Sequence, residues 1–127
     1  MAALKEKAIA LLSSTAVADL SSEIETTLYT VPTGKRCILT EAWLVVAGDV
    51  GAALVVTIGQ DTAETDFVGT TNGDNLDAAY DAIIMKPVPS ATPATCKSYA
   101  AATIIKFDVA TAGNAVAGTV YLFGFLY

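Results

Sequence analysis

Residues 27–47 constrain the fold more than any other segment, because their pattern predicts two β-strands joined by a short turn. Residues 28–31, Leu-Tyr-Thr-Val, favour an extended backbone, and β-type residues return from Cys37 onward. Between them, Pro32 fixes one φ angle and Gly34 permits a positive one, so the chain can reverse its direction. The segment therefore predicts a strand, a corner and a long strand.

The chain after residue 22 continues as short β-type segments separated by Gly, Asn, Asp and Pro. We expect strands at residues 24–31, 36–47, 53–60, 80–86, 101–110 and 116–127, with an edge strand at 16–20 as an open alternative. The connecting segments are 48–51, an acidic loop at 61–77, 87–93 and 112–114. Several strands without an internal helix predict an all-β fold, an antiparallel β-sandwich of the jelly-roll kind.

The first 22 residues differ from the rest and predict an N-terminal arm. Residues 2–12 favour a helix, with Leu4, Ala8, Leu11 and Leu12 at roughly helical spacing. Isolated helices are marginal in water below about 12 to 15 residues, so this one would need something to pack on. We therefore divide the chain into an arm, residues 1–22, and one β-sandwich domain, residues 23–127.

The charge balance and the lengths of the apolar runs argue against two classes of partner. With 7 Lys and Arg against 13 Asp and Glu, the net charge is −6, and no basic cluster is available to contact a phosphate backbone. We therefore expect no nucleic-acid partner. No apolar run approaches the roughly 18 residues that span a bilayer, so we expect no membrane partner either.

Histidine is absent, which removes the usual general base and the commonest zinc ligand. Ser and Thr are plentiful, but no base is evident to activate them, so we expect no catalytic residue, no enzyme activity and no cofactor. Cys37 and Cys96 are the two cysteines, and they form no CxxC motif. The sequence leaves open whether they are bonded to each other or reduced and buried.

Acidic residues gather between residues 61 and 81, where no Lys or Arg occurs. These carboxylates are Asp61, Glu64, Asp66, Asp74, Asp77 and Asp81. Calcium takes six to eight oxygen ligands, but the DxDxDG ladder with a distal Glu is missing. A solvated acidic loop without metal is the simplest expectation, and calcium binding is left open.

The last predicted strand is apolar on both faces. Val120, Leu122 and Leu126 fall on one face, and aromatic residues alternate with them on the other. A sandwich buries one face of a strand, so the second face needs a loop, the arm or another subunit, and we favour another subunit. Together with Trp43, which we place in the core or an interface, the predicted subunit interface is Trp43, Tyr121, Phe123, Phe125 and Tyr127.

Two segments, LYTVPTGKRCILTEAWL at 28–44 and DVATAGNAVAGTVYLFGFLY at 108–127, resemble the opening corner and closing hairpin of the jelly-roll capsid decoration (cement) proteins of tailed bacteriophages. The resemblance implies a homotrimer on the outer capsid surface of the virion, made in the host cytoplasm, that stabilises the shell by bridging major capsid proteins. The arm would then contact the capsid through Leu4, Ile9, Leu11 and Leu12. The alternative is a carbohydrate- or receptor-binding module of a phage tail tip or fibre, with the acidic loop as its site.

Overall fold

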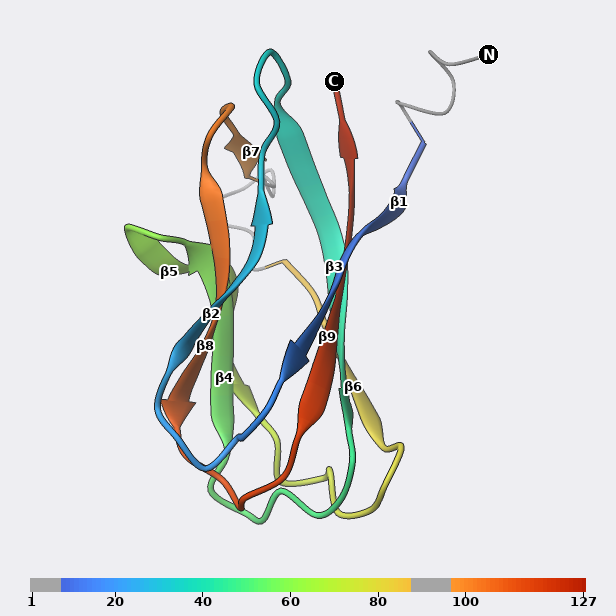
Figure 1. Cartoon of the computed structure of the whole chain (residues 1–127), viewed down its shortest axis with the longest axis vertical. Coiled ribbons are helices and arrows are strands. Elements are labelled where there is room, and N and C mark those ends of the chain that lie inside the picture. The colour runs from blue at the N-terminus through green and yellow to red at the C-terminus, as the bar shows by residue number, and fades with distance from the viewer. Residues whose placement is uncertain (1–7, 88–96) are drawn as a thin grey trace.

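The structure, a computed structural model, describes residues 8–87 and 97–127, and these form two facing antiparallel sheets (Figure 1). The first sheet contains β1 (Ala10–Val17), β3 (Cys37–Val46), β6 (Ala82–Met85), β7 (Ser98–Tyr99) and β9 (Gly118–Leu126). The second contains β2 (Glu25–Thr30), β4 (Val55–Gln60), β5 (Ala63–Asn72) and β8 (Ile104–Thr111). The described residues contain no helix that is long and apolar enough to cross a membrane.

The strand order is that of a long hairpin rolled into a sandwich. In the first sheet the order is β1-β9-β3-β6, with β7 also paired to β3, and in the second it is β2-β8-β4-β5. Strands counted from the two ends of the chain therefore pair with each other: β1 with β9, β2 with β8, β3 with β6 and β7, and β4 with β5. This pairing is the jelly-roll order, so the predicted fold class is confirmed.

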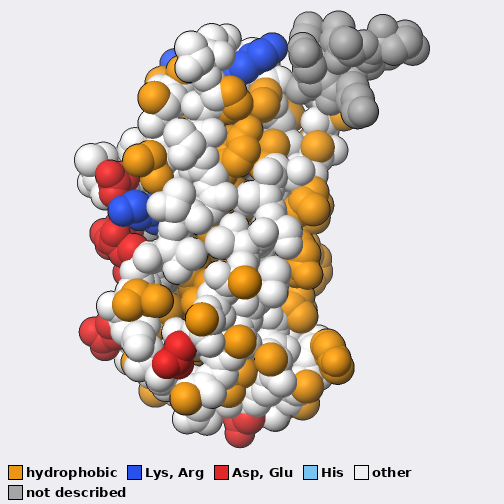
Figure 2. Space-filling view, viewed as in Figure 1, with side chains coloured by type: hydrophobic (Ala, Val, Ile, Leu, Met, Phe, Trp, Pro, Cys, Tyr) orange, Lys and Arg blue, Asp and Glu red, His pale blue; other side chains and the backbone are white. Residues whose placement is uncertain are grey.

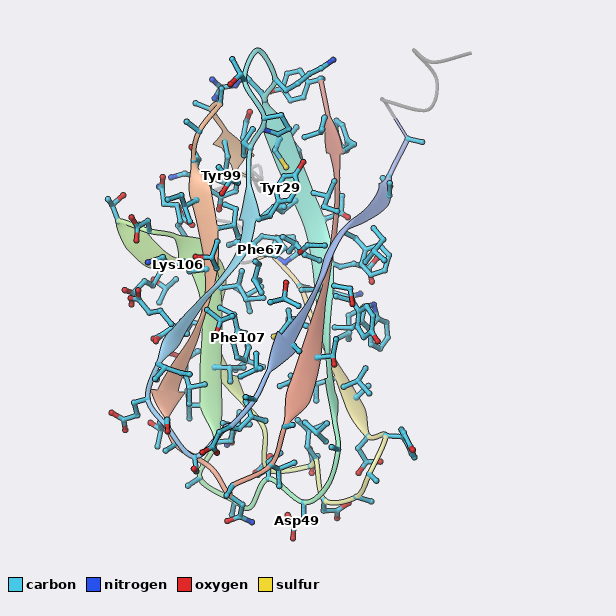
Figure 3. The ribbon with its side chains drawn as sticks, viewed as in Figure 1. Tyr29, Asp49, Phe67, Tyr99, Lys106 and Phe107 are labelled. Atoms are coloured by element: carbon cyan, nitrogen blue, oxygen red, sulfur yellow. The ribbon has the colours of Figure 1, made fainter. Side chains whose placement is uncertain are left out.

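The core lies between the sheets and consists of the inward-facing residues of each strand. On β9 these are Val120 and Leu122, and on β8 they are Ile105, Phe107 and Val109, all at most 1% exposed. Figure 3 places Phe67 and Phe107 between the two sheets and Lys106 on the outside of β8. The alternation of apolar and polar residues along β8 therefore produces one buried and one solvated face.

The N-terminal expectation needs correction. Ala10–Val17 form strand β1, which pairs with β9 from Ala10 opposite Gly124 to Val17 opposite Gly118. The helix predicted over residues 2–12 is therefore wrong for 10–12, because the free edge of β9 satisfies their backbone groups. Val17 and Leu20 are fully buried, so residues 10–20 are part of the sandwich and not a separate arm. Residues 1–7 lie outside the described residues.

The acidic segment 61–77 is also not one loop, because residues 63–72 form strand β5. Phe67 and Val68 point into the core, and β5 pairs with β4 through two irregularities of register. The turn between these strands is tight, since a Cβ atom on Gly59 would collide with the carbonyl oxygen of Ala63. The sequence hides this strand because polar residues surround its two buried positions.

Candidate functional site

The two outer surfaces of the sandwich differ in chemistry. Hydrophobic side chains follow the side of the molecule formed by β1 and β9, whereas most of the visible acidic side chains lie on the opposite side (Figure 2). The first surface is the outer face of the β1-β9-β3-β6 sheet, and it contains the residues that the sequence predicts for a subunit interface.

Strand register brings these residues together. Tyr121 on β9 lies opposite Trp43 on β3, and Trp43 lies opposite Ile84 on β6. Phe123 lies opposite Leu11 of β1. Directly paired residues share one face of a sheet, so these side chains are neighbours. We call this surface the apolar face, and it consists of Leu11, Ile38, Trp43, Ile84, Tyr121, Phe123 and Phe125.

The apolar face keeps much of its surface open to solvent in the single chain. Leu11 is 50% exposed and Ile84 is 40% exposed, while Trp43, Tyr121 and Phe123 are half-buried. The predicted two-sided character of the last strand therefore holds, with Val120 and Leu122 in the core and the aromatic residues outside. The structure brings Trp43 to the same outer face and not into the core.

Hydrogen bonds within the chain satisfy polar atoms of two aromatic residues on or beside this surface, Trp43 and Tyr127. The indole Nε1 of Trp43 donates to Glu41 Oε2 at 2.9 Å. Near the C-terminus, the Tyr127 hydroxyl lies 2.6 Å from Ser98 Oγ, and this hydrogen bond is the main reason that the pKa of Tyr127 is lowered. The Tyr127 ring is 6.1 Å from that of Phe125, so Tyr127 both anchors the chain end and extends the apolar face. Such satisfied groups can enter an interface without losing partners.

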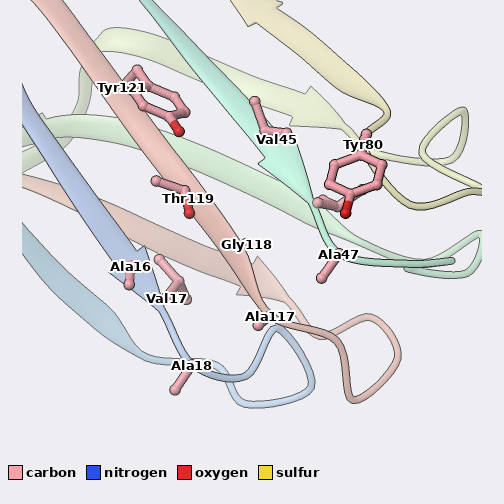
Figure 4. A pocket seen from close by; sticks show the side chains of 11 residues that line it. Ala16, Val17, Ala18, Val45, Ala47, Tyr80, Ala117, Gly118, Thr119 and Tyr121 are labelled. Carbon is pink, nitrogen blue, oxygen red and sulfur yellow. The ribbon is translucent and has the colours of Figure 1, made fainter.

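A hollow of about 340 Å³ lies at the other end of the same sheet. Small side chains from β1, β3 and β9 form its floor, and Figure 4 shows Tyr80 and Tyr121 among the residues that line it. Tyr80 is 88% exposed and has a positive φ of 72°. The lining residues are Ala16, Val17, Ala18, Val45, Val46, Ala47, Tyr80, Ala117, Gly118, Thr119 and Tyr121. Sequence reasoning missed this hollow, since only strand register aligns its small residues.

The residues assigned to a capsid-contacting arm separate in the structure. Ile9 is 62% exposed, and Leu11 belongs to the apolar face. Leu12 points the other way and packs against the core. Leu4 lies outside the described residues. Ile9 and Leu11 therefore remain available for contact, whereas Leu12 is part of the sandwich.

The acidic residues between 61 and 81 have separate structural roles and do not form one site. Asp66 accepts hydrogen bonds from Gln60 Nε2 at 2.7 Å and from the Tyr99 hydroxyl at 2.8 Å. Asp61 pairs with Lys106 at 2.9 Å, and Asp81 accepts from the backbone N–H of Ala78 at 2.9 Å. Asp74 and Asp77 are exposed. The expectation of a uniformly solvated loop is therefore wrong for Asp66.

Cys37 is a buried free cysteine. Burial raises the pKa of its thiol to about 11, which keeps the group protonated at neutral pH. Cys96 lies outside the described residues.

Comparison with known proteins finds structures of similar fold but no matching sequence family. No protein-family model matches the chain, and no curated protein matches it by sequence. Among solved structures, the chain is similar to one in the acidic stable capsid structure of Helicobacter pylori bacteriophage KHP30, with a TM-score of 0.57, 17% identity, and coverage of 93% of this chain and 91% of that one. The fold is therefore a jelly-roll sandwich similar to that of a phage capsid chain.

Two further likenesses are more distant. A chain of mud crab tombus-like virus gives a TM-score of 0.46 with 11% identity, covering 94% of this chain and 77% of that one. The Drosophila NLP core gives 0.42 with 13% identity, covering 91% and 98%. Both scores are too low to support a conclusion.

Proposed function

We propose that this protein is a structural component of a phage virion, a capsid decoration protein that binds the outer head surface as a homotrimer and bridges major capsid proteins. The observation that carries the proposal is the apolar face on the outside of the β1-β9-β3-β6 sheet. The likeness to a phage capsid chain supports it, because each chain covers more than nine-tenths of the other. The two proteins are therefore of similar length, as expected for two small capsid components.

The size of the apolar face suits one contact among several. Four strands about 4.8 Å apart and six residues along a strand give a surface of roughly 14 Å by 20 Å. The largest exposed apolar patch of a monomer commonly measures about 300 to 600 Å² and is often functional, whereas a stable interface buries about 800 Å² on each partner. The face would therefore form the centre of a subunit contact whose remaining area comes from the rim and from the shell.

The charge distribution also favours this face as the contact between copies. Subunits with a net charge of −6 repel each other, and the repulsion is smallest where acidic side chains are fewest. Glu41 is the acidic residue paired to Phe123 on this face, and it already accepts the Trp43 hydrogen bond. The acidic outer face of the other sheet would then point away from the contact.

Light scattering of the purified chain tests the trimer. We expect the wild-type protein to be trimeric at micromolar concentration, and Ile84→Asp and Phe123→Asp to dissociate it, because a buried unpaired carboxylate is costly. Ile24→Asp is the matched control, since Ile24 is 45% exposed, close to the 40% of Ile84, but lies off the apolar face. A monomeric wild type, or equal dissociation by Ile24→Asp and Ile84→Asp, would show that this face is not the interface.

A carbohydrate- or receptor-binding module of a tail tip or fibre is the second candidate. The observation that favours it is the exposed Tyr80 ring beside the hollow, because aromatic rings stack on sugars. Binding of the full chain to a glycan array, lost in Tyr80→Ala and retained in Ile84→Asp, would support this role. If neither the wild type nor Ile84→Asp retains any glycan, decoration of the capsid remains the favoured function.

A further inference from the structure

The fold assembles a carboxylate cluster that the sequence does not reveal. Glu25 on β2, Glu64 on β5 and Asp108 on β8 each place a carboxylate oxygen so that all three oxygens lie within 4.8 Å of one another. The three residues are far apart along the chain, and only Glu64 belongs to the acidic segment 61–81. The cluster lies on the outer face of the β2-β8-β4-β5 sheet, opposite the apolar face.

Strand register explains why these groups meet. Asp108 lies directly opposite Glu25 on one side and directly opposite Thr57 of β4 on the other. Paired residues share one face, so Glu25, Asp108 and Thr57 form a row across three strands. The tight turn beside Gly59 then brings the backbone of Glu64 against the same face, since a Cβ on Gly59 would also collide with Glu64.

Thr57 supplies an independent sign of a missing ligand. Its neighbours Val56 and Ile58 are buried in the core, so the Thr57 side chain lies on the outer face of the sheet, the same face as its cross-strand partner Asp108. Thr57 is only 3% exposed, and its Oγ1 atom is buried without a hydrogen-bond partner. Buried hydroxyl groups are normally paired with protein, water or an ion, so a ligand at the carboxylate cluster would supply the partner that Thr57 lacks.

The local charge has the sign that attracts a cation. Lys106 Nζ lies 3.1 Å from Glu25 Oε2 and 2.9 Å from Asp61 Oδ1. This one ammonium group is therefore the counter-charge for four neighbouring carboxylates, those of Glu25, Asp61, Glu64 and Asp108. One positive charge against four negative ones leaves a net negative charge at the cluster.

We propose that Glu25, Glu64, Asp108 and the Thr57 hydroxyl bind a hard divalent cation, calcium in preference to magnesium. All four donors are oxygens, and the exposed side of the cluster leaves room for waters. Calcium accepts such irregular sets of six to eight oxygens, whereas magnesium requires a nearly ideal octahedron. The bound ion would join β2, β5 and β8, and this site does not depend on the proposed role in a capsid.

Thermal unfolding and calorimetric titration of the full chain test the site. The protein is stripped with EDTA, dialysed, and compared in CaCl2, MgCl2 and NaCl of equal ionic strength. We expect calcium to raise the melting temperature more than the other salts, with a dissociation constant of about 0.1 to 1 mM, typical of extracellular calcium modules. Equal effects of the three salts would overturn the proposal.

Matched variants identify the ligands. Glu64→Gln should weaken calcium binding by at least about tenfold, whereas Asp74→Asn, an exposed carboxylate of the same segment outside the cluster, should leave it unchanged. Asp108→Asn repeats the test if Glu64→Gln does not fold. Calcium shifts of equal size in Glu64→Gln and Asp74→Asn would contradict the assignment.

Thr57→Val separates a ligand from a merely structural residue. Without calcium, this variant should melt at a higher temperature than the wild type, because it removes a buried hydroxyl that has no partner. With calcium, it should show a smaller rise than the wild type, because one ligand is lost. A full calcium-induced rise in Thr57→Val would show that Thr57 does not bind the ion and would refute the site as described.

Discussion

At the scale of single residues, Asp66 connects three strands through one carboxylate. Its oxygens accept hydrogen bonds from the backbone and side chain of Gln60 on β4 and from the hydroxyl of Tyr99 on β7. Tyr99 is 2% exposed, and burial is the main cause of its raised pKa. Lys97 lies 3.5 Å from the same carboxylate at its open side. The network therefore ties β5 to the opposite sheet.

Replacement of Asp66 should lower stability more than replacement of other acidic residues in its segment. Asp66→Ala leaves the buried Tyr99 hydroxyl without an acceptor, so we expect the free energy of unfolding to fall by about 1 to 3 kcal/mol. Asp74→Ala should change it by less than about 0.5 kcal/mol, because Asp74 is exposed. Urea denaturation monitored by the single tryptophan measures both values. Equal losses in the two variants would contradict the structural role of Asp66.

Glu64 should make the stability of the cation-free protein depend on pH. Its pKa is raised in the folded state, first by the hydrogen bond to Glu25, so folding favours its protonated form. The stability that this proton provides is complete below the pKa of the unfolded chain and is lost as the pH rises through the folded pKa. In EDTA at pH 7, Glu64→Gln should therefore be more stable than the wild type, and the difference should disappear at acidic pH.

Denaturation series at several pH values measure this difference. Asp74→Asn, which removes one charge outside the cluster, controls for the change in net charge. A wild type that is more stable than Glu64→Gln at pH 7 in EDTA would show that the Glu64 carboxylate is stabilising when charged.

Among the elements, strands rich in β-branched and aromatic residues could be predicted from the sequence. Strands that form only because a neighbouring strand offers hydrogen-bond partners could not. The predicted strands at 24–31, 36–47 and 116–127 correspond to β2, β3 and β9 within a few residues. The first three residues of β1, 10–12, belong to the segment expected to be helical, and they extend because β9 offers a free edge. β5 consists mainly of polar residues around Phe67 and Val68, so its pattern shows no regular alternation.

The candidate sites also differ in how far the sequence could predict them. Alternation along one strand was enough to predict Tyr121, Phe123 and Phe125 on an outer face, and the register with β3 adds Trp43. The hollow and the carboxylate cluster need the relative positions of three or more strands, which local sequence does not encode. Thr57 gives no signal in the sequence, because its significance lies in burial without a partner.

The position of β1 leads to a prediction about the N-terminus. Deletion of residues 1–9 leaves β1 intact, so the truncated chain should keep the wild-type melting temperature. If the proposed role holds and these residues contact the capsid, it should occupy capsid shells less fully. Deletion of residues 1–22 also removes Val17 and Leu20 from the core and exposes the edge of β9, so it should unfold the chain or lower its melting temperature strongly.

Calorimetry and quantified binding to purified shells measure these two effects. Equal melting temperatures for the two truncated chains would contradict the structural role of β1. Equal shell occupancy by the wild type and the chain lacking residues 1–9 would assign attachment to the sandwich alone.

At the scale of the whole molecule, the sandwich has two sides suited to different tasks. The apolar face can be covered by another copy, while the acidic side can remain in solvent with its proposed cation. A trimer attached at several points on a shell gains avidity beyond any single contact. If it binds only one state of the shell, it stabilises that state by mass action. The proposed function therefore needs no catalytic group.

Cryo-electron microscopy, at subnanometre resolution, of a virion that carries this chain would decide whether it is a trimeric decoration protein of the head. We predict three copies of this jelly roll around a local three-fold point on the outer head surface, with β9 and Trp43 at the contacts between copies. Density for the chain at a tail tip or fibre, on the inner surface of the head, or with the apolar face open to solvent would contradict it.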